Sequence, residues 1–170
     1  MMGYFNLPEE TNKAIDKEGW FHTGDIGCWE DNRFLKITDR KKALFKTSGG
    51  KYVAPQVIEN KLKESPLIEQ IMVLGNNRKF VAALIVPNKK FLNAQFSNEV
   101  RVIKNNDIQQ KIEAVVEEKN AFFSQTEKIK QFVLLNNEWT IDSGELTPSM
   151  KVKRKIVAEN NKYLIEGMYK

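Results

Sequence analysis

The feature that most restricts the fold is a run of seven consecutive apolar residues, Phe80–Val86. A strand with this composition carries apolar side chains on both faces, so it predicts a strand that is buried on both sides. A second apolar segment, Ile71–Leu74, precedes it across a polar turn at residues 75–79. The two segments therefore predict a β-hairpin, and other elements must pack against the sheet that it begins.

The remaining sequence contains both helix and strand patterns. The pair Asp31-Asn32 lies between two short alternating segments, and both residue types tolerate a left-handed turn, so these segments predict a hairpin. Residues 1–24 are polar and poorly periodic, like the end of a larger body, and residues 138–150 are irregular. We predict strands over 26–30, 33–37 and 129–135, and helices over 55–64, 89–123 and 153–169. The predicted class is α+β, with a β-hairpin, a small and mainly antiparallel sheet of about three strands, and packed helices.

Composition excludes several classes of site. The 170 residues include one cysteine and one histidine, Cys28 and His22, so an internal disulfide and a zinc site are excluded. No apolar run approaches the roughly 20 residues of a membrane-spanning helix, and the N-terminal residues do not resemble a signal peptide. These features predict a cytoplasmic protein that binds no metal through its own residues, with peripheral association at the inner membrane face kept as an alternative.

Basic residues are concentrated in one loop. The net charge is +5, and five cations lie with a single carboxylate between Asp39 and Lys51. A loop of this kind suits a phosphorylated or nucleotide-like ligand. A nucleic-acid partner is the other reading of a basic chain, but no helix-turn-helix, zinc-finger or RNA-binding strand motif accompanies it. Anionic small molecules and nucleic acid both remain open at this point.

Three segments contain side chains that could perform chemistry: His22–Asp25, Asp39–Lys51 and Thr147–Arg154. An Asp that follows Gly at the start of a strand can accept two hydrogen bonds from a ribose diol, or it can cap a turn. An Arg can offer its planar fork to nucleotide oxygens, or form a surface ion pair. A Lys that follows a loop proline can meet a phosphate or carboxylate, or be solvated. Each signal alone is weak.

Their order along the chain carries a family resemblance. The sequence resembles the C-terminal part of the adenylate-forming acyl-CoA synthetases, and its motifs are most similar to those of long-chain fatty acid–CoA ligases. The resemblance covers about residues 3–96 and 126–169, and residues 97–125 match no motif. The segments that carry it are Tyr4–Thr11, Gly19–Asp25, Asp39–Gln56 and Leu146–Arg154.

The resemblance implies a two-step reaction. A fatty acid carboxylate attacks the α-phosphate of ATP and releases pyrophosphate, and the thiol of coenzyme A then displaces AMP from the acyl-adenylate. In such enzymes a small C-terminal domain pivots on a larger N-terminal domain between the two steps. By position, Asp25 and Arg40 would contact the ribose, and Lys42 would be the hinge residue. Mg²⁺ is expected for the full-length enzyme, without ligands in this chain.

The resemblance assigns the thioester-forming and adenylating roles to separate loops. Ser48, Gly49 and Gly50 would line the coenzyme A tunnel, with Lys51 as a phosphate contact. Lys151 would be the catalytic lysine of adenylation, stabilising the charge that develops at phosphorus. Lys153 is the competing candidate, and we rank Lys151 above it.

One departure from the superfamily concerns the residue before that lysine. Most members have glycine there, whereas this chain has Met150. The long-chain ligases share the methionine, so the departure refines the subfamily.

The resemblance also implies a division of the chain. Residues 1–38 would be the end of the large N-terminal domain, 39–43 the hinge, and 44–170 the C-terminal domain with a helical insertion at about 97–125. The phosphate loop and acyl pocket of the family are not in this sequence, so we expect a fragment of a longer protein that is inactive alone. Its partners would be that N-terminal domain, fatty acid, ATP and coenzyme A. The alternatives are a basic module for nucleic acid or anionic membrane, and another acyl- or aryl-adenylating enzyme.

Overall fold

The computed structural model describes residues 1–41, 43–96 and 105–170. The chain divides into two compact units, a first unit of Met1–Leu44 and a second unit of Phe45–Lys170. The predicted hinge residue Lys42 and the first part of the predicted insertion, residues 97–104, lie outside the described residues. The predicted hinge and domain boundaries therefore stay predictions.

The first unit contains a short helix and a β-hairpin. Helix α1 (Pro8–Ala14) begins at proline, has no buried residue and was not predicted, because its seven residues carry no apolar periodicity. Strands β1 (Asp25–Glu30) and β2 (Phe34–Arg40) pair antiparallel. Asp31 and Asn32 adopt φ values of 52° and 53° in the turn between them. The Asp-Asn pair thus forms the left-handed turn that the sequence predicts, and the hairpin is confirmed.

The second unit is built on a three-stranded sheet of order β5-β6-β7. Strands β5 (Ile68–Leu74) and β6 (Val81–Pro87) form the predicted antiparallel hairpin. Strand β7 (Ile129–Leu134) is also confirmed, but it pairs parallel with β6, so the sheet is mixed. The parallel pairing follows from the long crossover between β6 and β7, which contains α3 (Lys89–Phe96) and α4 (Asn105–Asn120).

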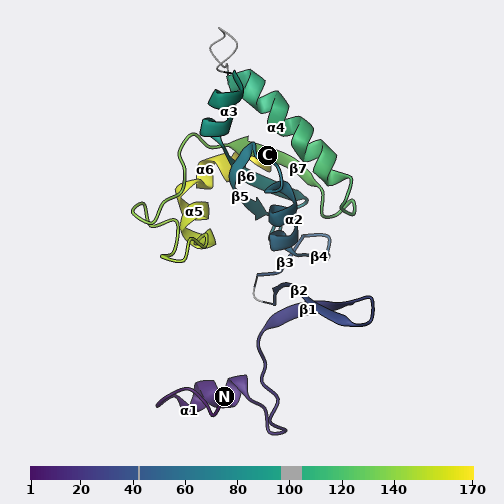
Figure 1. The fold of residues 1–170 in the computed structure, drawn as a ribbon, viewed down its shortest axis with the longest axis vertical. Helices are drawn as coiled ribbons and strands as arrows, with labels where there is room; N and C mark the ends of the chain where they lie inside the picture. The colour runs from purple at the N-terminus through teal and green to yellow at the C-terminus, as the bar shows by residue number, and fades with distance from the viewer. Residues whose placement is uncertain (42, 97–104) are drawn as a thin grey trace. The chain divides into compact units, whose positions relative to one another are not determined.

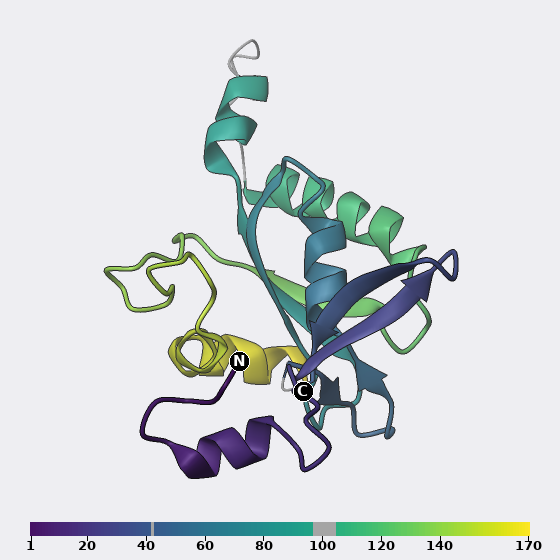
Figure 2. The ribbon, with the colours of Figure 1, turned by 60° about the horizontal axis from the view of Figure 1, so that its bottom comes forward.

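Strand β6 is buried on both faces, as its composition predicts. Every residue from Val81 to Pro87 is buried, and alternate side chains enter two separate apolar clusters. Helices α2 (Pro55–Leu62) and α4 contribute to the first cluster, and α5 (Arg154–Asn160) and α6 (Lys162–Met168) contribute to the second. Figures 1 and 2 show these helix pairs on opposite sides of the sheet. The second unit therefore has three layers.

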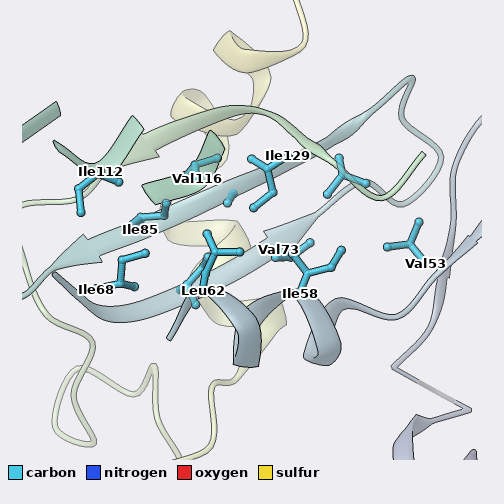
Figure 3. Packing of buried hydrophobic residues seen from close by; sticks show 12 residues of the cluster. Val53, Ile58, Leu62, Ile68, Val73, Ile85, Ile112, Val116 and Ile129 are labelled. Carbon is cyan, nitrogen blue, oxygen red and sulfur yellow. The ribbon is translucent and has the colours of Figure 1, made fainter. Parts of the chain in front are cut away.

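The first cluster shows how tightly these layers pack. Ile58 and Leu62 of α2 are 1% and 0% exposed, and they point toward the strands that carry Val73 and Ile85 (Figure 3). Complete burial of a Leu or Ile side chain contributes about 1.5–3 kcal/mol. Helix α2 is thus fixed to the sheet by its apolar face, and the loop before it has a rigid support.

Three local features differ from the prediction. The predicted helix over 153–169 is two helices, because Asn161 (φ −110°, ψ 20°) interrupts it and its side chain donates a hydrogen bond of 2.9 Å to the carbonyl of Val157. The predicted helix over 89–123 is present as α3 and α4 in its described parts. Strands β3 (Phe45–Lys46) and β4 (Tyr52–Val53) were not predicted, because two residues are too few to show alternation.

Candidate functional site

Asp25 and Arg40 are cross-strand partners at the open end of the first unit's hairpin. They lie opposite each other in the register of β1 and β2, and Arg40 Nε lies 3.1 Å from Asp25 Oδ1. The Asp25 side chain is 27% exposed and that of Arg40 is 74% exposed. The Thr23 hydroxyl accepts a hydrogen bond from the Asp25 amide at 3.0 Å. The two predicted ribose contacts are therefore adjacent, because strand pairing places them side by side.

The predicted coenzyme A loop lies in the second unit between β3 and β4. The Thr47 amide donates to the Lys51 carbonyl at 2.9 Å, and the Gly50 amide donates to the Thr47 carbonyl at 2.9 Å. The Ser48 amide donates to the carbonyl of Arg78, in the β5–β6 turn, at 2.9 Å. Gly49, Gly50 and Lys51 are exposed, whereas Thr47 is buried. The loop is thus closed on itself and attached to the sheet, with its tip free to meet a ligand.

Lys151 lies at the end of a loop with the same hydrogen-bond pattern. The Thr147 amide donates to the Lys151 carbonyl at 2.8 Å, and the Met150 amide donates to the Thr147 carbonyl at 2.8 Å. The Thr147 hydroxyl also accepts the Lys151 amide at 3.0 Å. A bridge between Leu146 and Val152 closes the base of this loop, which we call the lysine loop (Leu146–Val152). The Lys151 side chain is exposed, and among the described residues its ammonium has no ion-pair or hydrogen-bond partner.

The two loops share an unusual backbone position. The residue three positions after the loop threonine, Gly50 in one loop and Met150 in the other, is left-handed, with φ of +79° and +60°. This region suits glycine and costs other residues about 1–2 kcal/mol. The loop geometry therefore suits the glycine that the superfamily resemblance leads us to expect at position 150, and Met150 departs from that expectation. Lys153, the competing candidate, is half-buried just before α5.

A partly buried ion pair beside the lysine loop was missed from the sequence. Glu59 on α2 is 5% exposed, and its Oε1 lies 2.6 Å from Nη2 of Arg154, the first residue of α5. Burial raises the pKa of Glu59, and the Arg154 guanidinium and the Val73 amide oppose that rise. The two residues are 95 positions apart, so no local pattern connects them. The only sign of this ion pair in the sequence was that a basic residue, Arg154, follows shortly after Lys151.

Within the described residues, no group of three or more His, Cys, Asp and Glu side chains could hold a metal ion. These residues therefore offer no candidate ligand set for the Mg²⁺ that the family resemblance implies. The same described part of the chain contains no helix long and apolar enough to cross a membrane.

Comparison with known proteins identifies the family. Residues 43–170 match the family model described as the AMP-binding enzyme C-terminal domain. The chain belongs to this family. Over 98% of its length it is 39% identical to the long-chain-fatty-acid–CoA ligase FadD15 of Mycobacterium tuberculosis, and it spans 29% of that relative. The resemblance seen in the motifs is thus confirmed.

Two solved structures support both the fold and the family. The adenylation domain of a carboxylate reductase from Mycobacterium chelonae matches 98% of this chain and 26% of its own, with a TM-score of 0.81 and 26% identity. The adenylation domain of a carboxylic acid reductase from Segniliparus rugosus, solved with AMP and a co-purified carboxylic acid, has a TM-score of 0.79 and 25% identity. The match again covers 98% of this chain and 26% of that one. The present chain, a member of the AMP-binding C-terminal domain family, therefore spans about a quarter of the length of each of these solved chains.

Proposed function

We propose that this AMP-binding C-terminal domain acts in a long-chain fatty acid–CoA ligase. The observation that carries the proposal is 39% identity over 98% of the chain to a protein named as such a ligase, with Lys151 exposed on an ordered loop. We call the protein that the proposal requires, this chain joined to an N-terminal adenylation domain, the complete ligase. The family supports ATP as a substrate, and the relative's name supports coenzyme A and a long-chain fatty acid.

In the first half-reaction, a carboxylate oxygen of the fatty acid attacks the α-phosphorus of ATP. The bond from the α-phosphorus to the bridging oxygen breaks, and pyrophosphate leaves. Lys151 would place its ammonium beside the reacting carboxylate and phosphate, where negative charge is concentrated. At about 4 Å and an effective dielectric constant near 20, one such charge pair is worth about 4 kcal/mol. Lys151 would act through its charge, without forming a covalent bond.

In the second half-reaction, the sulfur of coenzyme A attacks the acyl carbonyl carbon and AMP leaves. Ser48, Gly49 and Gly50 would line the path of the coenzyme, because they form an exposed loop tip on which little side chain separates a ligand from the backbone. Lys51 would offer a charge to a phosphate. Asp25 would accept hydrogen bonds from the ribose hydroxyls, and its partner Arg40 would contact the same sugar.

Lys42 is proposed as the hinge residue on family resemblance alone. Replacing Lys42 with Pro in the complete ligase should restrict rotation and slow mainly one half-reaction. Unchanged rates in both half-reactions would remove the hinge assignment. Location in the cytoplasm, with peripheral membrane association as the alternative, is likewise a proposal, and cell fractionation tests it.

The reaction is tested by following substrate-dependent release of pyrophosphate and AMP, with acyl-CoA measured by mass spectrometry. Palmitate should support all three products in the complete ligase, and benzoate and free amino acids should not. Formation of adenylates from benzoate or amino acids, and not from palmitate, would favour another adenylating enzyme of the superfamily. The comparisons do not favour a nucleic-acid module. Salt-dependent micromolar binding of oligonucleotides without any adenylate would reverse that conclusion.

A further inference from the structure

The ion pair of the buried Glu59 with the half-buried Arg154 completes the outer edge of the sheet. Strand β5 is an edge strand, so one side of its backbone has no neighbouring strand among the described residues. At Val73, the side chains of Glu59 and Arg154 form the backbone hydrogen bonds that a neighbouring strand would otherwise form. The Val73 amide donates to Glu59 Oε1 at 2.7 Å, and Arg154 Nη1 donates to the Val73 carbonyl at 3.1 Å. With the 2.6 Å contact between Arg154 Nη2 and Glu59 Oε1, the three residues form a closed ring of hydrogen bonds.

This ring joins three elements that are distant in sequence. Glu59 comes from α2, Val73 from β5 and Arg154 from the start of α5. Helix α2 is itself fixed to the sheet by Ile58 and Leu62. Arg154 therefore attaches the beginning of α5 to a rigid support, and it uses two nitrogens of its guanidinium to do so. A fork that binds two acceptors fixes orientation as well as distance.

Stability alone is a poor explanation for an ion pair with a buried carboxylate at this position. Removing the charge of Glu59 from water is costly, and a well-packed apolar pair of similar volume often stabilises a fold as much or more. The surroundings of Glu59 are already apolar, because Ile58 and Leu62 on the same helix are fully buried. What the ion pair adds is a directional connection between α5 and the edge of β5.

The segment so attached carries Lys151. Only two residues separate Lys151 from Arg154, so the lysine backbone lies within about 10–11 Å of the ring at full extension. Between them, the Lys153 amide donates to the Glu145 carbonyl at 2.8 Å, and Val152 is bridged to Leu146. Helix α5 has no side-chain cap at its N-terminus. Leu146 and Val152 hold the base of the lysine loop in the second apolar cluster, and Arg154 adds a directional contact between the segment after the loop and the edge of β5.

We infer that Glu59 and Arg154 are positioning residues for acyl-adenylate formation, because they hold the lysine loop and its Lys151 in one place against the sheet. The inference rests on the proposed function of Lys151. A displacement of about 1 Å from productive geometry can cost on the order of 100-fold in rate, even when its origin is remote from the chemistry. Neither residue is required to touch a substrate.

The test is a double-mutant cycle in the complete ligase. Acyl-adenylate formation is measured in a single turnover for the variants Arg154→Met, Lys151→Ala and both together. Thioester formation from supplied acyl-adenylate is measured in parallel, because a general loss of folded protein lowers both rates. The matched control is Lys155→Met, which removes the same charge one residue along α5, where the side chain is 89% exposed. Arg154→Lys is the second variant, which keeps the charge and loses the fork.

We expect Arg154→Met to slow acyl-adenylate formation at least about tenfold. It should leave thioester formation unchanged, and it should add no further loss to Lys151→Ala. Arg154→Lys should show a smaller loss of the same kind, which keeps the test valid if Arg154→Met does not fold. In the 170-residue chain, the amides of Met150 and Lys151 should exchange hydrogen faster in Arg154→Met than in Lys155→Met.

Equal slowing of both half-reactions, or an additive loss in the double variant, would show that Arg154 acts on stability and would overturn the inference. An unchanged rate of acyl-adenylate formation in Arg154→Met and Arg154→Lys would also overturn it, and would leave the proposed role of Lys151 intact. An unchanged rate in Lys151→Ala would instead contradict the proposed function itself. The two failures are therefore distinguishable.

Discussion

Replacing Met150 with glycine is expected to stabilise the chain. Met150 has a φ of +60°, in the left-handed region that glycine enters without steric cost. The equivalent residue of the loop between β3 and β4, Gly50, has a φ of +79° and already suits this geometry. The two loops thus allow opposite substitutions at the same backbone position, Met150→Gly in one loop and Gly50→Ala in the other.

The expected change in the free energy of unfolding of Met150→Gly combines two opposing contributions. A left-handed conformation costs a residue with a side chain about 1–2 kcal/mol, which Met150→Gly relieves. Glycine in turn loses about 0.5–1 kcal/mol more conformational entropy on folding. Met150 is 66% exposed, so little packing is lost. The net expectation is a gain of about 0.5–1 kcal/mol.

Urea unfolding of the 170-residue chain, followed by circular dichroism, measures this difference. Gly50→Ala should lose about 0.5–1 kcal/mol, because the added Cβ meets nothing closer than 3.8 Å and only the backbone is strained. Gly49→Ala is the control, since Gly49 lies outside the left-handed region and its Cβ would be 3.9 Å from the Thr47 hydroxyl. It should be neutral or slightly stabilising. The interpretation is refuted if Met150→Gly destabilises the chain, or if both alanine variants behave alike.

Three further substitutions test the packing and the buried groups. Tyr169→Phe should stabilise the fold by about 1 kcal/mol, because the buried hydroxyl has no hydrogen-bond partner in the described part of the chain. Burial raises the pKa of Tyr169 to about 12, so wild-type stability should fall as pH rises from 10 to 12, and the Phe variant should lack that fall. Gly75→Ala should cost about 1–3 kcal/mol, since its Cβ would lie 2.7 Å from the ring of Phe45, whereas Gly167→Ala, which meets nothing within 4 Å, should not destabilise. The raised pKa of Glu59 predicts that the stability of wild type relative to Glu59→Gln falls as pH rises above 4.5; a rise instead would show that Arg154 dominates.

Local patterns in the sequence predicted those parts of the fold that depend on local physics. The apolar run Phe80–Val86 identified the strand that is buried on both faces, because composition alone decides that property. Asp31 and Asn32 identified a turn, because their side chains tolerate a positive φ. Pro55 identified the start of α2, where its absent amide hydrogen is not needed.

The rest depends on contacts between distant residues. Nothing near Ile129 indicates that β7 pairs parallel with β6, because the pairing follows from the path of the crossover. The apolar pattern continues across the junction of α5 and α6 at Asn161, so the periodicity does not reveal that the helix is interrupted there. Glu59 looks like any helix carboxylate until Arg154 is placed beside it. For the candidate site, the structure added the geometry of the predicted residues, and their roles stay predictions.

The most direct test of the proposed role of Lys151 is the effect of Lys151→Ala on each half-reaction of the complete ligase. Rapid-quench measurement should show acyl-adenylate formation slowed by at least about 100-fold. Thioester formation from supplied acyl-adenylate and coenzyme A should be preserved, and Lys153→Ala should keep both rates. Equal loss of both half-reactions in Lys151→Ala, or the selective loss appearing in Lys153→Ala instead, would contradict the assignment of Lys151.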